Sequence, residues 1–495
     1  MPRVASPVSP ARRVAAAVLR RVEEEGAYAD RALAGEAARA GLDGREHAFA
    51  TALAYGAVQR RRTLDHAIAR LARRPAGQLD PPLRVALRLG LLQLLFLDGV
   101  APHAAVDQSV ELAKAAGGPG YRLVNAVLRR ATREGAAIVA ALDDRTPEGA
   151  ALRHSVPDWI ARLWWEALGA EEARALLARV NAPAESALRV NTLAAEPLAV
   201  AAALAGREVE VRPAELDGRP RAARAAPGAP APGAPATGGP ALGAPATGGL
   251  LALPEGLVVD GPFDLRGDPL FASGALLAQS RAAMAAARLL DPRPGERVLD
   301  LCAAPGGKTT HLAALMGGAG AVVAVERHPG RAEALRRACK RLRADWVVSV
   351  ETGDASEPRR DGPFDRVLVD PPCSGLGTLQ GRPDLRWRAS SAAVAELAEL
   401  QGRILAAGAA ALAPGGTLLY VTCTISPAEN EGVVAAFLAA NPAFALDDLG
   451  AELPALAARG MPRALQLLPH RDGTDGFFLA RLRRLSRDHE TLSSW

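Results

Sequence analysis

Apolar residues over the first 140 positions recur at spacings of three and four, and clusters of proline and glycine separate the runs. This spacing places the apolar residues on one face of a helix. It predicts helices at residues 11–25, 47–72, 80–97, 104–116 and 121–132. No strand pattern interrupts these runs, so we predict an all-α domain over residues 10–140.

The pattern changes after residue 154. A helical stretch gives way to a short apolar run at residues 187–192, which predicts a strand. A helix beginning at Pro197 and a second strand at residues 208–212 follow. Together these elements predict a small α+β joining subdomain over residues 154–213.

Residues 214–250 differ in composition from the rest of the chain. Proline, alanine and glycine dominate, and the sequence Gly-Ala-Pro-Ala-Thr-Gly-Gly occurs at both 233–239 and 243–249. Such a segment buries too little apolar surface to offset the conformational entropy that ordering would remove. We therefore predict a disordered insertion here.

Strand and helix patterns alternate from residue 251 to residue 485. The predicted strands lie at 297–301, 321–325, 347–350, 366–369 and 416–421, with helices from 309, at 331–343 and at 391–413. Strands that alternate with helices form a mostly parallel sheet joined by right-handed crossovers. An alternating segment at 476–482 predicts a closing strand. The fold class of this part is therefore α/β, with a Rossmann-like domain over residues 251–485.

Positive charge is concentrated at the start of the chain. The 495 residues carry a formal charge of +5, but residues 1–140 hold 21 Arg and Lys against 13 Asp and Glu. That is a net charge of +8, which leaves −3 for the remainder. A basic helical domain predicts a polyanionic partner, most often nucleic acid, with a merely solvated basic face as the alternative.

Cysteine usage and hydropathy favour a cytoplasmic protein. The four cysteines have neither paired zinc spacing nor the density of a disulfide scaffold, so no metal is expected. No signal-peptide pattern appears, and no apolar run reaches the roughly 20 residues of a membrane span. We expect reduced thiols and no membrane partner.

The segment Val298–Leu312 predicts a strand, a tight turn and a helix. Gly306 and Gly307 let a ligand approach the backbone closely, beside the free N–H groups that open the helix. A P-loop would need glycine where Cys302 stands, and the dinucleotide pattern G-x-G-x-x-G is absent. An adenosyl cofactor without a pyrophosphate, namely S-adenosylmethionine, therefore fits the turn best.

Acidic residues fall at the ends of the predicted parallel strands, where ligands of such sheets bind. Glu326 lies 20 residues after Gly306, about the spacing of a carboxylate that binds ribose hydroxyls. Asp354 is placed to accept a hydrogen bond from an adenine amino group, and Asp300 and Asp370 end two further strands. A solvated loop carboxylate is the alternative for each, and the series disfavours it for Glu326 and Asp370.

Two cysteines also follow strand ends, Cys373 in Asp-Pro-Pro-Cys-Ser-Gly and Cys423 in Thr-Cys-Thr. If those strands are neighbours, both thiols reach one rim of the sheet. Thiolate addition to C6 of a pyrimidine lets C5 attack a methylsulfonium, and a carboxylate such as Asp370 can hydrogen-bond N3. This chemistry alone does not decide which cysteine attacks. Cys339, on a predicted helix with no motif, is expected to be an inert core thiol.

Motifs in both halves of the chain resemble known families. Leu-Arg-Val-Ala-Leu-Arg-Leu-Gly-Leu-Leu-Gln-Leu at 83–94, with 105–114 and 123–129, resembles the NusB family, whose helical domain binds RNA. Residues 300–309, 370–375, 382–387 and 422–424 resemble the motifs of the RNA (cytosine-5)-methyltransferases. In this order they resemble the bacterial Sun/RsmB family, which methylates 16S ribosomal RNA. The resemblance covers nearly the whole chain outside the insertion.

The resemblance implies roles for individual residues. The attacking cysteine of the family's Thr-Cys motif is Cys423 here, Cys373 of the Pro-Cys motif assists product release, and Asp370 completes the catalytic set. The implied contacts to S-adenosylmethionine are Cys302, Ala303, Ala304, Pro305, Gly306, Gly307, Lys308, Glu326, Asp354 and Asp370. The chain departs from the family at Ser280, where Asp is common, and at Pro371, where Ala is common. Neither change removes a catalytic group.

A basic and aromatic segment follows the Cys373 motif. Arg382, Arg386, Trp387 and Arg388 are expected close to the phosphates around a flipped base. Trp387 has two open interpretations, stacking on RNA or pinning its own loop. Arg189 and Asn191 are weaker RNA candidates, and a structural role is favoured for both.

We therefore expect a cytoplasmic, monomeric enzyme that transfers methyl from S-adenosylmethionine to C5 of a cytosine. Its expected partner is 16S ribosomal RNA. DNA is not expected, because the Thr-Cys motif has no role in the DNA enzymes. One alternative is the same chemistry on transfer RNA, which the NusB-like front disfavours. The other is a non-catalytic RNA-binding ribosome assembly factor, which the presence of Cys373, Cys423 and Asp370 disfavours.

Overall fold

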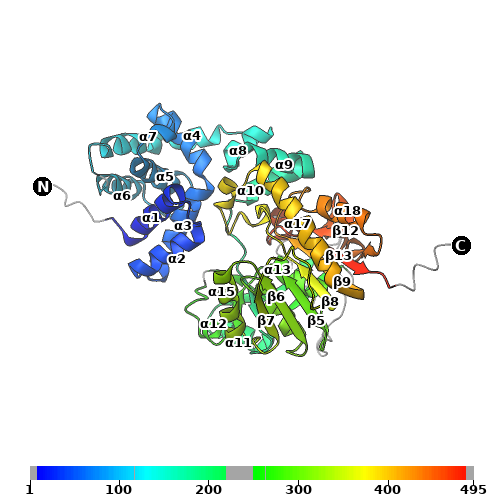
Figure 1. Cartoon of the computed structure of the whole chain (residues 1–495). Coiled ribbons are helices and arrows are strands. Elements are labelled where there is room, and N and C mark those ends of the chain that lie inside the picture. The colour runs from blue at the N-terminus through cyan, green and yellow to red at the C-terminus, as the bar shows by residue number, and fades with distance from the viewer. Residues whose placement is uncertain (1–7, 116, 219–248, 262, 487–495) are drawn as a thin grey trace. The chain divides into compact units, whose positions relative to one another are not determined.

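The computed structural model describes residues 8–115, 117–218, 249–261 and 263–486 (Figure 1). Packing divides the chain into two units. Unit 1 comprises residues 1–183 together with 378–390, and unit 2 comprises residues 184–377 with 391–495. We call residues 378–390 the strap, because the chain leaves unit 2 there, contributes this segment to unit 1 and then returns.

Unit 1 is all-α, as predicted. Its helices pack around a core that includes Leu53, Leu64, Leu87 and Leu128, each fully buried. They are α1 (Pro10–Glu24), α2 (Ala29–Ala40), α3 (Gly44–Gln59), α4 (Arg61–Ala72), α5 (Pro81–Leu95), α6 (Pro102–Ala115), α7 (Tyr121–Ala140), α8 (Pro147–His154), α9 (Asp158–Leu168), α10 (Ala170–Arg179) and α16 (Leu385–Arg388), with a 3-10 turn η1 (Ala76–Gln78). The apolar α5 is central and packs against α3, α4, α6 and α7.

The helix predicted at 47–72 is wrong in one respect, because two helices occupy this region. α3 ends at Gln59 and α4 begins at Arg61, while Arg60 between them has φ −98° and ψ 14°. The Arg60 guanidinium lies 4.2 Å from the centroid of the Phe96 ring. Neither glycine nor proline marks this break, so the apolar periodicity runs through it.

Unit 2 is built on a nine-stranded sheet of order β11-β12-β13-β9-β8-β5-β6-β7, with β10 paired to β13. The strands are β5 (Arg297–Leu301), β6 (Ala321–Glu326), β7 (Val348–Thr352), β8 (Phe364–Val369), β9 (Leu412–Thr422), β10 (Phe444–Leu446), β11 (Ala457–Ala458), β12 (Met461–Gln466) and β13 (Phe478–Arg484). Strands β5 to β9 pair in parallel, as predicted, whereas β10 to β13 are antiparallel. The predicted closing strand is β13.

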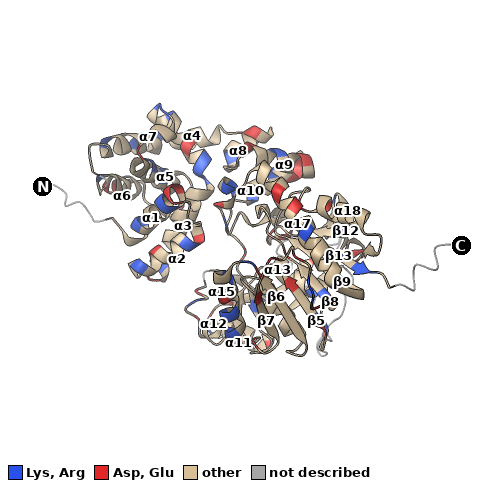
Figure 2. Ribbon diagram, viewed as in Figure 1, with Lys and Arg blue, Asp and Glu red and all other residues tan. Residues whose placement is uncertain are grey.

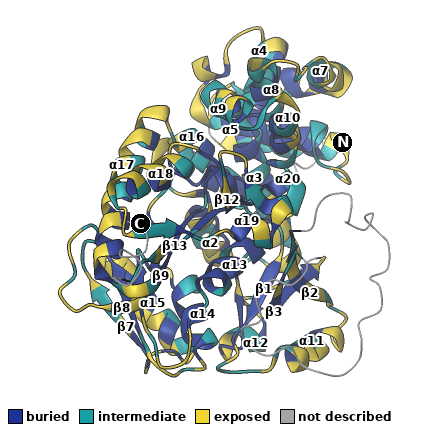
Figure 3. Cartoon of the chain, turned by 90° about the vertical axis from the view of Figure 1, so that its right-hand side faces the viewer, coloured by how far each residue is buried: buried dark blue, intermediate teal, exposed yellow. Residues whose placement is uncertain are grey.

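Helices cover both faces of this sheet. Val298 and Val322 pack with α13 (Arg281–Leu290), α14 (Gly307–Leu315) and α15 (Pro329–Arg341), while their neighbours Leu299 and Val323 pack with α17 (Ser391–Ala411) and α18 (Glu431–Ala440). Figure 3 shows the resulting buried strands. The shorter helical elements are α12 (Pro269–Ala272), α19 (Leu449–Glu452), α20 (Pro469–Asp472), η3 (Leu376–Thr378) and η4 (Pro454–Leu456). This is the three-layer α/β arrangement expected from the alternating pattern. Among the described helices, none is long and apolar enough to span a membrane.

A second sheet of four strands, in the order β2-β3-β1-β4, belongs to unit 2. Its elements are β1 (Ala187–Val190), α11 (Pro197–Ala205), β2 (Glu210–Asp217), β3 (Leu250–Asp260) and β4 (Leu276–Ala278). The expected boundaries of the insertion need correction, since β2 continues to Asp217, which pairs with Leu250. Burial of Ala214 and Leu216 explains this continuation. The rest of the predicted insertion, 219–248, lies outside the described residues.

Candidate active site

The turn between β5 and α14 lies at the carboxyl edge of the parallel strands. Its first part is fixed to the neighbouring strand, because the Ala303 N–H donates to the Val325 carbonyl at 2.9 Å. Gly306 has φ 101°, and a Cβ there would meet Leu335 Cδ1 at 2.5 Å. Both the dihedral angle and the space therefore demand glycine at this position.

Cys302 begins the turn with a positive φ of 66° and a half-buried thiol. Burial raises the pKa of this thiol, and the charges of Asp370, Asp300 and Glu326 raise it further. Three of the four acids predicted at strand ends therefore lie around the same turn. A neutral thiol amid carboxylates is a poor nucleophile, so Cys302 lines the site without reacting.

Glu326 and Asp354 lie where they were predicted, at the end of β6 and after β7. Glu326 is 2% exposed, accepts a hydrogen bond from the His328 N–H at 2.9 Å and lies 3.4 Å from the Arg331 guanidinium. Asp354 Oδ1 accepts from Ser356, from its N–H at 2.9 Å and its hydroxyl at 2.7 Å, and these bonds lower the pKa of Asp354. Both carboxylates are thus held in fixed positions.

Asp300 has a structural role. It is 1% exposed within β5, and its Oδ2 accepts a hydrogen bond from the Thr309 hydroxyl at 2.6 Å. Burial raises the pKa of Asp300 to about 7. This hydrogen bond connects the first turn of α14 to β5. Asp300 therefore stabilises the β5–α14 connection from within the sheet.

Asp370 and Lys308 form an ion pair at the end of β8, with Lys308 Nζ 2.6 Å from Asp370 Oδ2. Burial alone would lower the pKa of Lys308, but the Asp370 carboxylate outweighs this effect and raises it. Lys308 also interacts electrostatically with Cys423. A charged ammonium group therefore interacts with both the acid and the cysteine that were predicted to act together.

The two predicted catalytic cysteines do meet at one rim. β8 and β9 are parallel neighbours with Val369 opposite Tyr420, so the residues that follow these strands lie side by side. The Cys373 and Cys423 sulfurs are 3.2 Å apart. The hydrogen bond with Cys423 and then burial raise the pKa of Cys373 well above the usual thiol value. Cys373 thus keeps its proton at neutral pH.

Glu429 joins the two cysteine loops and was missed by the sequence analysis. Its side chain is completely buried. It accepts hydrogen bonds from the Ser374 N–H at 2.7 Å and from the Ser374 hydroxyl at 2.5 Å. The Ser374 hydroxyl also lies 2.7 Å from that of Thr424. Because Ser374 follows Cys373 and Thr424 follows Cys423, this carboxylate holds both loops.

Further polar contacts fix the position of Glu429. Gln401 Nε2 donates to Glu429 Oε1 at 3.1 Å and to the Pro372 carbonyl at 2.9 Å. The Tyr420 hydroxyl donates to the Glu429 carbonyl at 2.6 Å. The only sequence signal was an acidic residue shortly after a catalytic motif, which does not by itself distinguish a buried clamp from a solvated side chain.

The strap corrects the prediction that Arg386 and Arg388 meet RNA phosphates. Arg386 is completely buried and donates to six partners within unit 1, the Asn181 side chain and the carbonyls of Gln59, Ser155, Val180, Leu379 and Pro383. Arg388 donates hydrogen bonds to the Asp384 carboxylate and to the carbonyls of Gly26 and Ala27. Both arginines thus fasten the strap. Arg382 is exposed and stays an RNA candidate.

Trp387 fixes the strap in place, since its Nε1–H donates to the Val58 carbonyl at 2.8 Å.

Arg189 and Asn191 have structural roles, which was the favoured interpretation of both residues. Arg189 is fully buried and donates to the Gly307 carbonyl and the Thr310 hydroxyl, while Asn191 donates to two backbone carbonyls.

Comparisons with known proteins agree with this arrangement. Residues 287–483 match the profile of the 16S rRNA methyltransferase RsmB/F family, residues 9–133 match the NusB family, and residues 156–218 match an RsmF/B-like ferredoxin-like domain. The crystal structure of PH0851 superimposes with a TM-score of 0.73 at 25% identity, over 97% of this chain and 100% of that one.

Two sequence relatives extend over almost the full length. The chain is 36% identical to "Probable ribosomal RNA small subunit methyltransferase B" of Synechocystis sp., over 96% of this chain and 99% of that protein. It is 37% identical to ribosomal RNA small subunit methyltransferase B of Thermus thermophilus, over 89% of this chain and 90% of that protein. With its NusB-like unit, Rossmann-like sheet and paired cysteines, the chain belongs to the RsmB/F family of ribosomal RNA methyltransferases.

Proposed function

We propose that this protein transfers a methyl group from S-adenosylmethionine to C5 of a cytosine in 16S ribosomal RNA, through a covalent adduct between Cys423 and C6. The observation that carries the proposal is the pair of thiols 3.2 Å apart beside the Lys308–Asp370 ion pair. A metal-free methyltransferase acting on an oxygen or nitrogen atom has no need of two adjacent thiols.

The residues of the turn suit S-adenosylmethionine. The site combines a glycine turn at Gly306, the amino end of α14 and fixed carboxylates at Glu326 and Asp354. These groups match the methionine, ribose and adenine parts of the cofactor, with Glu326 for the ribose hydroxyls and Asp354 for the adenine amino group. When bound, the cofactor supplies an electrophilic methyl group. Residues 302–308 would hold its methionine portion.

Cys423 is the proposed nucleophile. Cys373 keeps its proton, and its sulfur lies 3.2 Å from the Cys423 sulfur, within hydrogen-bond reach. The ammonium group of Lys308 interacts electrostatically with the Cys423 sulfur. The thiolate adds to C6, a carbon–sulfur bond forms, and the electron pair of the C5–C6 double bond moves toward C5 and N3.

Asp370 and Lys308 stabilise the charge that develops on the base. N3 takes a proton from this ion pair and hydrogen-bonds to the Asp370 carboxylate. C5 then accepts the methyl group, loses its proton to water and re-forms the double bond as the Cys423 sulfur leaves. The thiol of Cys373 hydrogen-bonds to the departing sulfur and assists its release, and the proton on N3 returns to the pair.

The ribosomal substrate rests on the family and on the basic unit 1. The relatives named above act on ribosomal RNA of the small subunit by name, and unit 1 matches the NusB profile. Figure 2 shows Lys and Arg on the helices of this unit. Arg60 directly precedes α4, and Arg61 and Arg62 begin it. Transfer RNA as substrate and a non-catalytic assembly role are the competing proposals.

Radiolabelled methyl transfer decides among these proposals. Unmodified 16S RNA, transfer RNA and DNA are incubated in parallel with labelled S-adenosylmethionine, and the nucleosides are then separated. Label in 5-methylcytidine from 16S RNA alone is the expected result. Label in transfer RNA would keep the chemistry and overturn the substrate, and label in another nucleoside would overturn the chemistry. Cofactor binding without any transfer would favour the assembly factor.

A further inference from the structure

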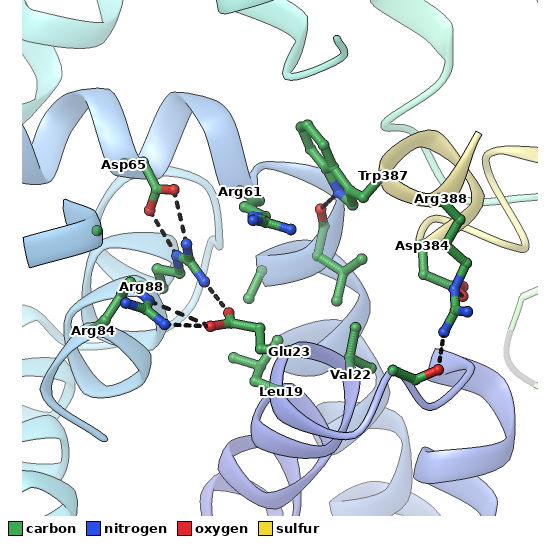
Figure 4. Close-up of a pocket in the computed structure, with 14 residues that line it drawn as sticks. Leu19, Val22, Glu23, Arg61, Asp65, Arg84, Arg88, Asp384, Trp387 and Arg388 are labelled. Carbon is green, nitrogen blue, oxygen red and sulfur yellow. Dashed lines mark hydrogen bonds and ion pairs between the residues drawn. The ribbon is translucent and has the colours of Figure 1, made fainter. Parts of the chain in front are cut away.

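Unit 1 contains a pocket of about 400 Å³ where the strap packs on α1, α3 and α4 (Figure 4). Its walls come from these three helices, from η1 and α5, and from Asp384, Trp387 and Arg388 of the strap. Pockets of this size hold small ligands or parts of larger ones. None of its lining residues takes part in the methyl-transfer chemistry, so the pocket needs an explanation of its own.

One wall of the pocket is an ionic network that is already balanced. Arg88 donates to Asp65 at 2.7 and 2.8 Å and also pairs with Glu23. Arg84 donates to Glu23 at 3.1 Å. On the opposite wall, Asp384 is paired with Arg388. The three carboxylates of the pocket are thus engaged by three of its four arginines.

Arg61 is the fourth arginine, and in the described part of the chain it has no ion-pair partner of its own. Its guanidinium lies 5.3 Å from the centroid of the Trp387 ring. Among the described residues, no carboxylate lies within 4.0 Å of this guanidinium and no side chain or carbonyl accepts a hydrogen bond from it. Burial lowers the pKa of Arg61, Arg88 and Arg84 add to this effect, and the more distant carboxylates of Glu23 and Asp65 offset only part of it. A half-buried guanidinium with unused donors provides a site for an anion, above all for a phosphate.

The remaining wall is apolar. Leu19, Val22, Ala57 and Val58 line it beside the Trp387 ring. The hydrogen bond from Trp387 to the Val58 carbonyl fixes the orientation of that ring. An anionic group at Arg61 would therefore lie next to a rigid apolar and aromatic surface, which suits a ribose or a base attached to the phosphate.

We infer that this pocket binds one nucleotide of the RNA substrate, with its phosphate on Arg61 and its nucleoside against the apolar wall. The inference rests on the proposed function, since it requires an RNA substrate. RNA offers a phosphate at every nucleotide, and the pocket lies in the basic, NusB-like unit. The strap that carries Trp387 begins shortly after Cys373 in the chain. A nucleotide bound in this pocket would contact the strap, which follows the Cys373 loop in the sequence.

The first test measures binding of a 16S RNA fragment to the full chain across salt concentrations, with S-adenosylhomocysteine in place of the methyl donor. Arg61→Gln should weaken binding about tenfold at low salt and reduce the slope of log affinity against log salt by about 0.7, as expected for one lost phosphate contact. Arg45→Gln is the matched control, because Arg45 is exposed, lies in the same unit and carries the same charge. It should change affinity less than twofold.

The second test locates the phosphate. RNAs that carry a single neutral methylphosphonate at successive positions are bound to wild type and to R61Q. At one position the substitution should weaken wild-type binding and have no further effect on R61Q. If R61Q were to unfold, Arg61→Lys would serve in its place, with a retained salt slope and a severalfold lower affinity.

The outcomes separate this inference from the proposed function. No RNA binding by the wild-type protein would overturn both. Wild-type binding that R61Q leaves unchanged, or that R45Q weakens equally, would overturn the pocket alone. A loss in R61Q that no methylphosphonate position reproduces would also overturn it, because the pocket would then hold a free anion or a protein group.

Discussion

At the scale of single residues, the roles proposed for the two adjacent sulfurs are separable. Cys423→Ala removes the proposed nucleophile and should lower methyl transfer by at least about a thousandfold, with cofactor binding unchanged. Cys373→Ala should instead leave RNA attached to Cys423, since the departing sulfur loses its hydrogen-bond donor. A denaturing gel detects that adduct as a retarded band, and the double variant should show none. Full turnover by C423A would exclude Cys423 as the nucleophile.

Glu429 tests whether the two cysteine loops act as one element. Glu429→Gln keeps the shape of the side chain but replaces one acceptor oxygen with an NH2 donor. The glutamine side chain then cannot accept hydrogen bonds from both the N–H and the hydroxyl of Ser374. We expect kcat to fall about 10- to 100-fold and the cofactor Kd to stay unchanged. Glu396→Gln, at an exposed position of α17, is the control. An unchanged kcat for E429Q in a folded protein would show that the clamp is dispensable.

Asp300 makes a prediction about pH. Its folded-state pKa of about 7 lies above the unfolded value near 4, so the folded state binds this proton more tightly. The resulting stabilisation is complete below about pH 4 and is lost as the pH rises through about 7, by at most about 4 kcal/mol. Asp300→Asn keeps an acceptor for Thr309 and does not ionise. Urea unfolding measures the free energy of unfolding at pH 5 and at pH 8. Between these two values it should fall more for wild type than for D300N, and an equal fall would contradict the raised pKa of Asp300.

At the scale of elements, the sequence predicted what depends on local pattern and missed what depends on distant contacts. The β5–α14 turn was predictable, because a strand ending in two glycines before a helix has few other structures. The break at Arg60 was not, since nothing local marks it. The roles of Arg386 and Glu429 could not be predicted either. A charged residue near a motif is normally expected on the surface, and only the tertiary partners Asn181 and Ser374 show that these two side chains are buried and structural.

The β2–β3 hairpin leads to an element-scale prediction. Asp217 pairs with Leu250 and the Gly218 N–H donates to the Gly249 carbonyl at 2.7 Å, so the chain enters and leaves residues 219–248 at adjacent points. Replacing 219–248 with a two-residue Asn-Gly turn should preserve the hairpin. The melting temperature should stay close to that of wild type, and the rate of methyl transfer should stay within about twofold of it. A folded variant that no longer methylates RNA would instead give these residues a part in substrate binding.

At the scale of the whole molecule, charge and chemistry lie in different parts of the chain. Residues 1–140 carry a net charge of +8, whereas the thiols, the ion pair and the β5–α14 turn all belong to unit 2. The chain passes between the units through the strap, whose buried Arg386 fixes it to unit 1. RNA binding and methyl transfer should therefore respond differently to conditions that act on charge alone.

Salt concentration is such a condition. Cations on unit 1 that neutralise RNA phosphates release counterions, so kcat/KM for a 16S RNA fragment should fall at least about tenfold between 50 and 200 mM salt. The value of kcat at saturating RNA should change less than twofold, because the Lys308–Asp370 pair and the two thiols are partly or wholly buried and only weakly screened. Steady-state kinetics at four salt concentrations measure both quantities. A kcat that falls in parallel with kcat/KM would mean that screening reaches the chemical step, and a salt-independent kcat/KM would remove unit 1 as an electrostatic RNA-binding surface.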